Sequence, residues 1–138
     1  MATTAGASAA LPVRKGEKPW TEAELKKVRQ QLQSDIDGLT ADINEAESAI
    51  AERLSDAVGD AGDDTADAGA KTFQREHELA LTQNARELLA ASRRALARID
   101  EGTFGVCESC GQPIGKARLQ AFPRATLCVT CKQREERR

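Results

Sequence analysis

A cysteine-rich segment runs from Cys107 to Cys131 and reads CESCGQPIGKARLQAFPRATLCVTC. It holds all 4 cysteines of the chain as two C-x-x-C pairs, with 17 residues between the pairs. This spacing is typical of a tetrahedral zinc site, because two intervening residues let one tight turn direct two sulfur atoms at one ion. Gly111, directly after the first pair, permits the backbone to fold back against the metal. Two disulfides or four unrelated buried thiols are the alternatives. The absence of a secretory signal disfavours disulfides, since the cytosol keeps thiols reduced.

The ligand set indicates a structural zinc ion rather than a catalytic one. Catalytic zinc keeps one position open for water or substrate, whereas four thiolates close the coordination shell and leave the ion a poor Lewis acid. The only histidine, His77, lies in a helical stretch upstream of the cysteines and is expected to be a solvated helix residue. We therefore predict one structural Zn²⁺, bound by Cys107, Cys110, Cys128 and Cys131, in a protein that is not an enzyme.

Composition sets the fold class. The chain has 138 residues, of which only 3% are aromatic and 30% are charged. Such a chain lacks the apolar bulk for a large globular core and suits long paired helices instead. Its net charge of −2 provides no general attraction to nucleic acid or to an anionic membrane. It has no run of 18 apolar residues that could span a membrane and no signal peptide, so we expect a cytoplasmic protein.

Two amphipathic helices precede the cysteines. A capping box, Thr21 to Glu24, marks the start of the first helix, and Trp20 with Leu25 can form a hydrophobic staple over it. Gly102 suits the residue after the end of the second helix. Narrow apolar stripes with spacings near a heptad predict a coiled coil. The first stripe consists of Leu25, Val28, Leu32, Ile36, Leu39, Ile43, Ala46 and Ile50, and the second of Leu81, Ala85, Leu88, Ser92, Ala95 and Ile99.

These patterns predict a mostly α-helical protein in three parts. Residues 1–19 are expected to be a disordered tail, and residues 20–101 a long antiparallel coiled-coil hairpin. Residues 102–138 are expected to form a small four-cysteine zinc finger followed by a short C-terminal helix. We place the turn of the hairpin near Gly59–Asp63 and the start of the second helix near Thr65, because glycine and aspartate disfavour helix interiors.

The turn of the hairpin forms an acidic tip near residues 56–68. No lysine or arginine occurs between Arg53 and Lys71. Most acidic runs are solvated loops, but a tip at the end of a long arm can deliver its carboxylates into a narrow space. There they could meet Mg²⁺, which prefers oxygen ligands, or basic side chains.

The segment from Gly102 to Lys132 resembles the C4 zinc finger of the DksA/TraR family, and the likeness extends more loosely from Trp20 to the end of the chain. Members of that family are bacterial transcription regulators that bind RNA polymerase directly. They insert a coiled-coil hairpin into its secondary channel and destabilise promoter complexes, often together with ppGpp. The resemblance implies the same fold and function here, with the core polymerase as partner.

The same resemblance assigns roles to single residues. The family's acidic tip motif falls on Asp64 and Asp67, with Gly69 in place of the family's alanine. The family's cationic ppGpp positions fall on Ala91, Phe122 and Lys132, of which only the lysine is basic, so ppGpp binding should be weak or absent. Two other functions stay open. One is a nucleic-acid-binding zinc ribbon, favoured by the basic residues of the finger, and the other is a passive coiled-coil adaptor. We expect a monomer without sequence-specific DNA binding.

Overall fold

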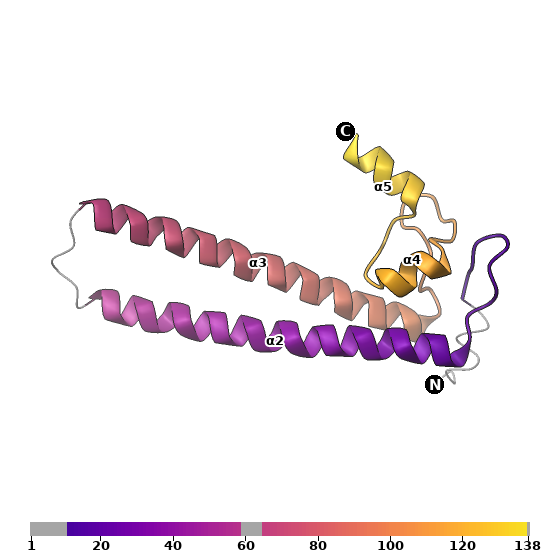
Figure 1. Cartoon of the computed structure of the whole chain (residues 1–138), viewed down its shortest axis with the longest axis horizontal. Coiled ribbons are helices and arrows are strands. Elements are labelled where there is room, and N and C mark those ends of the chain that lie inside the picture. Colours follow the sequence, from indigo (N-terminus) through magenta and orange to yellow (C-terminus); the bar gives the residue numbers. More distant parts are fainter. Residues whose placement is uncertain (1–10, 59–64, 138) are drawn as a thin grey trace. The chain divides into compact units, whose positions relative to one another are not determined.

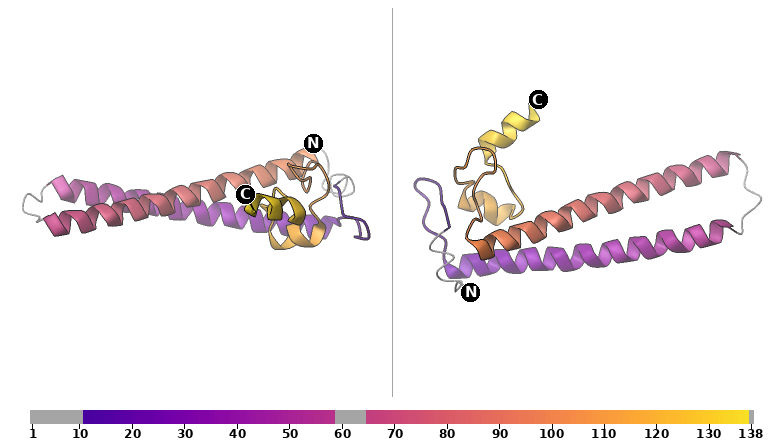
Figure 2. Two further views of the ribbon diagram at one scale, coloured as in Figure 1. Left: turned by 90° about the horizontal axis from the view of Figure 1, so that it is seen from above. Right: turned by 180° about the vertical axis from the view of Figure 1, so that it is seen from behind.

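In the computed structural model, described for residues 11–58 and 65–137, the chain is mostly α-helical. The element order is α2 (Glu22–Val58), α3 (Thr65–Glu101), α4 (Lys116–Ala121) and α5 (Val129–Glu136). Helices α2 and α3 each have 37 residues and lie side by side as the arms of a hairpin (Figures 1 and 2). An isolated antiparallel bridge between Val106 and Pro113 accompanies them. The predicted fold class is thereby confirmed, as is the start of the second helix at Thr65, whereas the turn predicted near Gly59–Asp63 lies outside the described residues.

Local sequence signals fix the outer ends of the hairpin helices. At the start of α2 the Thr21 hydroxyl accepts from the Glu24 amide at 3.1 Å, and the Glu24 carboxylate accepts from the Thr21 amide at 2.9 Å. At the end of α3, Gly102 has φ +79°, and the amides of Gly102 and Thr103 donate to the carbonyls of Ile99 and Arg98. This is a Schellman motif. The predicted capping box and the predicted terminal glycine are both confirmed.

The described residues form two compact units. One unit combines the residues up to Asp35 with those from Ala91 onward. The beginning of α2 and the end of α3 therefore belong to the same unit as the cysteine-rich segment. The other unit runs from Ile36 to Ala90 and contains the rest of α2 and α3. In the first unit, Leu25, Leu32 and Ile99 are completely buried in one apolar cluster with Phe104 and Leu119. Burial of this kind stabilises the unit by about 1.5–3 kcal/mol for each large side chain.

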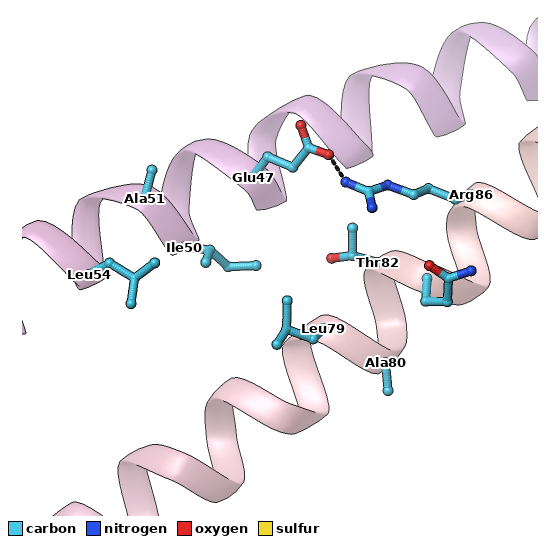
Figure 3. Close-up of a pocket in the computed structure, with 9 residues that line it drawn as sticks. Glu47, Ile50, Ala51, Leu54, Leu79, Ala80, Thr82 and Arg86 are labelled. Atoms are coloured by element: carbon cyan, nitrogen blue, oxygen red, sulfur yellow. Dashed lines mark hydrogen bonds and ion pairs between the residues drawn. The ribbon is translucent and has the colours of Figure 1, made fainter.

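The second unit buries its apolar stripe less completely. Ile36 and Ile43 are buried, but Leu54 is 45% exposed. Between the helices lies a groove lined by Ile50, Ala51, Leu54, Leu79 and Thr82 among others (Figure 3). Cross-helix ion pairs of Arg86 with Glu47 and of Arg53 with Glu78 join the two arms in this unit.

One register prediction in the second helix is wrong. Leu81 was expected in the stripe but is 57% exposed, and its neighbour Thr82 is buried instead. Thr82 tolerates this position because its hydroxyl donates to the carbonyl of Glu78 at 2.9 Å. A threonine can therefore occupy an inward position without leaving its hydroxyl donor unpaired. At this point of the second helix the buried position is one residue later than the apolar spacing predicts.

Residues 11–19 differ from the predicted disordered tail. Leu11 is buried in the apolar cluster of the first unit, as is Trp20, which directly follows residues 11–19. The ring centroids of Trp20 and Phe104 lie 5.9 Å apart. We call residues 11–19 the strap. Its Glu17 accepts hydrogen bonds from the amides of Lys116 and Ala117 at 3.0 and 3.2 Å. The strap thus packs against the cysteine-rich segment, while residues 1–10 lie outside the description. Among the described helices, none is long and apolar enough to cross a membrane.

Candidate metal centre

The first cysteine pair lies in a tight turn. The amide of Gly111 donates to the carbonyl of Cys107 at 3.0 Å, and the amide of Cys107 donates to the carbonyl of Gln112 at 2.9 Å. Gly111 has φ +73°, a conformation that residues with a Cβ adopt only at a cost. The glycine therefore closes the turn that brings Cys107 and Cys110 to the same point, as the sequence predicts.

The second pair lies at the beginning of a helix. Cys128 is the N-cap residue of α5, and Cys131 is buried in its first turn. Extended backbone at Cys128, with ψ 166°, followed by helical backbone, turns both sulfur atoms to one side. The amide of Glu108 donates to the carbonyl of Thr126 at 2.9 Å and so connects the two pairs.

The four sulfur atoms converge. All lie within 4.8 Å of one another, and the sulfurs of Cys110 and Cys128 are 3.8 Å apart. All four cysteines are free, so the alternative of two disulfides does not apply to this structure. A Zn–S distance of about 2.3 Å places tetrahedral ligands about 3.8 Å apart. The donor set and its spacing therefore fit one Zn²⁺, and they leave no ligand position for water or substrate.

The titration of the cluster also favours a cation at its centre. Burial raises the pKa of Cys107, but the amides of Cys110, Cys128 and Ser109 outweigh burial and bring the pKa to about 6. In contrast, the hydrogen bond with the Cys128 sulfur raises the pKa of Cys131 to about 12. Protein groups alone thus favour the Cys107 thiolate and oppose the Cys131 thiolate. A bound divalent cation removes this opposition, because it stabilises all four thiolates together.

The shell around the cluster is apolar and well packed. Cys107 and Cys131 are buried together with Phe104, Ile114 and Leu119, while Cys110 is exposed. The guanidinium of Arg118 donates to the carbonyl of Leu127 at 3.3 Å and so holds the chain just before the second pair. Arg98 of α3 forms an ion pair with Glu108 in the first turn. The cluster is therefore tied to the end of the hairpin by both apolar and charged contacts.

The other predicted site residues do not join the cysteines. Asp67 lies in the first turn of α3 with an exposed side chain, and Asp64 lies outside the described residues. His77 is exposed, as expected for a solvated helix residue. Of the ppGpp positions implied by the resemblance, Phe122 is 63% exposed and Lys132 forms an ion pair with Glu135 at 3.8 Å.

The sequence patterns did not reveal the role of Glu17. It caps α4, whose N-cap residue Gly115 has no side chain to do so. Only the short six-residue length of α4 and its glycine N-cap hint that the hydrogen-bond acceptor for its first amides must come from another part of the chain. The strap approaches Gly115 closely, because a Cβ added at this glycine would lie 2.9 Å from the Arg14 side chain.

Comparisons with known proteins agree on one group of relatives. Residues 102–137 match the family described as the prokaryotic dksA/traR C4-type zinc finger. The RNA polymerase-binding transcription factor DksA of Caulobacter vibrioides is 41% identical over 75 residues, which cover 54% of this chain and 53% of that protein. The chain thus spans about half the length of this relative. The protein of the same name from Escherichia coli K12 is 29% identical over 117 residues, covering 85% of this chain and 74% of that protein.

A solved structure shows the same likeness beyond the finger. The structure of transcription factor DksA2 from Pseudomonas aeruginosa superposes with a TM-score of 0.67 at 31% identity. The similarity covers 84% of this chain and 85% of that one. It therefore includes the long helices as well as the cysteine-rich segment.

Proposed function

This chain belongs to the DksA/TraR family of C4-type zinc finger proteins, and we propose that it is a transcription regulator that binds RNA polymerase directly. The observation that carries the proposal is the likeness to DksA2 over 84% of the chain, hairpin included. Two further relatives are named RNA polymerase-binding transcription factors. A protein of this kind acts by binding and needs no catalytic residues of its own.

The hairpin is proposed to enter the secondary channel of the polymerase with its acidic tip first. Helices of 37 residues reach about 55 Å at 1.5 Å per residue, yet two helices side by side remain narrow. Asp64 and Asp67 are proposed to act at the tip. Carboxylates at that place can interact with Mg²⁺ or with basic side chains near the active site of the polymerase.

The cysteine cluster is proposed to hold one structural Zn²⁺ through Cys107, Cys110, Cys128 and Cys131. A structural zinc site of this type contributes on the order of 10 kcal/mol to folding in small domains. The ion would keep the finger folded at the outer ends of α2 and α3. We further propose a cytoplasmic monomer in which ppGpp has little effect, because Ala91 and Phe122 stand where the family presents cations.

The main rival, a nucleic-acid-binding zinc ribbon, is weakened by the partners of the basic residues. Lys116 forms an ion pair with Glu24 at 2.6 Å, and Arg124 forms one with Asp35 at 3.6 Å. These cations are therefore partly neutralised within the protein. Phe122 is the only strongly exposed aromatic side chain of the described finger, whereas binding to single strands usually needs several stacking platforms.

A binding measurement separates these functions. The zinc-loaded full chain is titrated against core RNA polymerase and, in parallel, against free duplex and single-stranded DNA at several salt concentrations. The proposal predicts saturable binding to the polymerase and negligible binding to free DNA near physiological salt. Tight DNA binding that weakens steeply with salt, together with no polymerase binding, would favour the zinc ribbon.

A further inference from the structure

The loop of residues 105–115 carries the first cysteine pair, and the strap lies against both of its ends. At the first end, a Cβ added to Gly105 would lie 3.8 Å from the carbonyl oxygen of Pro12. At the other end, a Cβ added to Gly115 would lie 2.9 Å from the side chain of Arg14. The strap therefore packs against the loop both where the loop begins and where it ends.

Apolar contacts of the strap extend to the cysteines themselves. Leu11 is 5% exposed and belongs to the same apolar cluster as Cys107 and Cys131. Val13 is partly buried and packs against this cluster. All of these residues lie in one compact unit. The strap thus covers apolar surface that two of the proposed zinc ligands help to form.

Glu17 connects the strap to the segment that joins the two cysteine pairs. Its carboxylate accepts hydrogen bonds from the amides of Lys116 and Ala117, at 3.0 and 3.2 Å, in the first turn of α4. Helix α4 lies between the first pair and the second pair in the chain. A segment that is already ordered loses less conformational entropy when the metal binds, so a docked strap should raise the affinity of the four cysteines for zinc.

We propose that docking of the strap and binding of zinc by the four cysteines are linked, so that each strengthens the other. The inference rests on the proposed Zn²⁺ site. If the strap raises the affinity for zinc, bound zinc must hold the strap in place by the same factor. Glu17 acts through α4 and is a positioning residue of the metal centre. Because the strap leads directly into the capping box at Thr21, loss of zinc releases the chain just before α2 as well as the finger.

A strap with only a structural role leads to a different expectation. If the strap docks equally well with and without zinc, loss of Glu17 destabilises both forms equally, and the affinity for zinc stays the same. The lost charge acts in the opposite direction. A zinc ion with four thiolates carries a net charge of about −2, so removing a nearby carboxylate favours the complex. A weaker affinity in a Glu17 variant therefore reports the lost hydrogen bonds.

The test measures the zinc affinity of the full reduced chain at neutral pH, by competition with a chromophoric chelator. Glu17→Ala is compared with the parent and with Glu45→Ala, which removes the same group at an exposed position of α2 in the other unit. We expect Glu17→Ala to bind zinc about tenfold more weakly, which corresponds to about 1.4 kcal/mol, and the control to change by about twofold at most. Leu11→Ala, which removes an apolar contact of the strap instead, should weaken binding at least about tenfold.

Hydrogen exchange of the parent chain measures the reciprocal effect. The amide of Arg14 donates to the Glu17 carboxylate at 2.8 Å within the strap, so its exchange reports whether the strap is ordered. We expect removal of zinc by a chelator to raise the exchange rate at Arg14 at least about tenfold. The amide of Ile43, on α2 in the second unit, is the control and should change by about twofold at most.

Unchanged zinc affinity in Glu17→Ala or in Leu11→Ala would overturn the inference, even if the variant lost stability in urea. Exchange at Arg14 that does not respond to zinc would overturn it as well. If Glu17→Ala does not fold, Glu17→Gln provides the same test with an expected loss of about threefold. A parent chain that binds no zinc would instead refute the proposed metal site, and this inference would fail with it.

Discussion

Glu17 offers a sharp test of how the strap contributes to stability. Its carboxylate accepts hydrogen bonds from three amides: Arg14 at 2.8 Å, Lys116 at 3.0 Å and Ala117 at 3.2 Å. Two of these amides belong to the first turn of α4, which has no side-chain cap of its own. The substitution Glu17→Ala removes all three acceptor contacts, whereas Glu17→Gln keeps one oxygen and removes the charge.

The expected loss follows from capping energetics. Replacing an N-cap acceptor by alanine costs about 0.5–2 kcal/mol, and water can replace part of the loss because Glu17 is only partly buried. We therefore expect Glu17→Ala to lower the free energy of unfolding by about 1.5 kcal/mol and Glu17→Gln by about half as much.

The loss should depend on pH. Burial raises the pKa of Glu17, but hydrogen bonds from the amides of Lys116, Arg14 and Ala117 outweigh it and lower the pKa from its ordinary value. A lowered pKa in the folded state means that the ionised carboxylate stabilises the protein above the unfolded pKa of about 4.3. This stabilisation is lost as the pH falls through the folded-state pKa. The difference between parent and Glu17→Gln should therefore be full near neutral pH and shrink in acid.

The only tryptophan provides the assay. Trp20 is 3% exposed in the cluster that the strap joins, so its fluorescence reports unfolding of this unit in urea. Glu45→Gln, at an exposed position of α2, serves as the control and should change stability by less than about 0.5 kcal/mol. If Glu17→Ala were as stable as this control at neutral pH, the strap would not cap α4, and the reasoning would be refuted.

Three further predictions concern the metal, the seam and ppGpp. Cys110→Ser should reduce bound zinc well below one ion per chain and expose Trp20 to solvent while much of the far-ultraviolet helix signal remains; full zinc content by elemental analysis would contradict this. Ser92→Ala should raise the free energy of unfolding by about 1 kcal/mol, since Ser92 is fully buried and its hydroxyl has no partner among the described residues; a clear loss in urea unfolding would show that the hydroxyl is used. Adding ppGpp should barely change the effect on a promoter, because Ala91 and Phe122 supply no charge-assisted donors; strong enhancement in a transcription assay would contradict that assignment.

Features encoded by neighbouring residues could be predicted from the sequence. The C-x-x-C spacing predicts that the two sulfur atoms of each pair lie together, because a single turn of the backbone brings them to one side. The Thr21–Glu24 capping box and the Gly102 helix end likewise depend on residues within one or two turns. In each case the chemistry of a few adjacent positions leaves little choice of backbone conformation.

Features that depend on distant residues were missed. The strap is held by Glu17 on Lys116, 99 residues further along the chain, and no local pattern announces such a contact. The inward position of Thr82 instead of Leu81 depends on a hydroxyl satisfied within its own helix, which apolar periodicity does not register. Leu54 and Leu79 are 45% and 49% exposed in the second unit, where both line the groove between α2 and α3. Burial is a property of the pair of helices and not of one stripe.

The proposed action of the tip can be tested separately from binding to the polymerase. Asp64 and Asp67 should contribute little contact area to binding, but they carry the charge that is proposed to act. Asp64→Asn and Asp67→Asn keep the side-chain size and remove the charge. Because Asp67 is exposed, its substitution should change the free energy of unfolding by no more than about 0.5 kcal/mol. Gly69→Ala is the companion variant. An added Cβ there meets nothing within 4 Å, and alanine favours the first turns of α3 by about 1 kcal/mol.

The lifetime of promoter open complexes, measured with saturating protein, shows whether the acidic tip acts on the polymerase. We predict that the parent chain shortens this lifetime and that Gly69→Ala does so at least as strongly. The double variant Asp64→Asn/Asp67→Asn should bind core polymerase nearly as well as the parent but leave the lifetime unchanged. A double variant that shortens the lifetime as much as the parent would contradict the role of the acidic tip. A parent chain and a Gly69→Ala variant that both bind without any effect would contradict it equally.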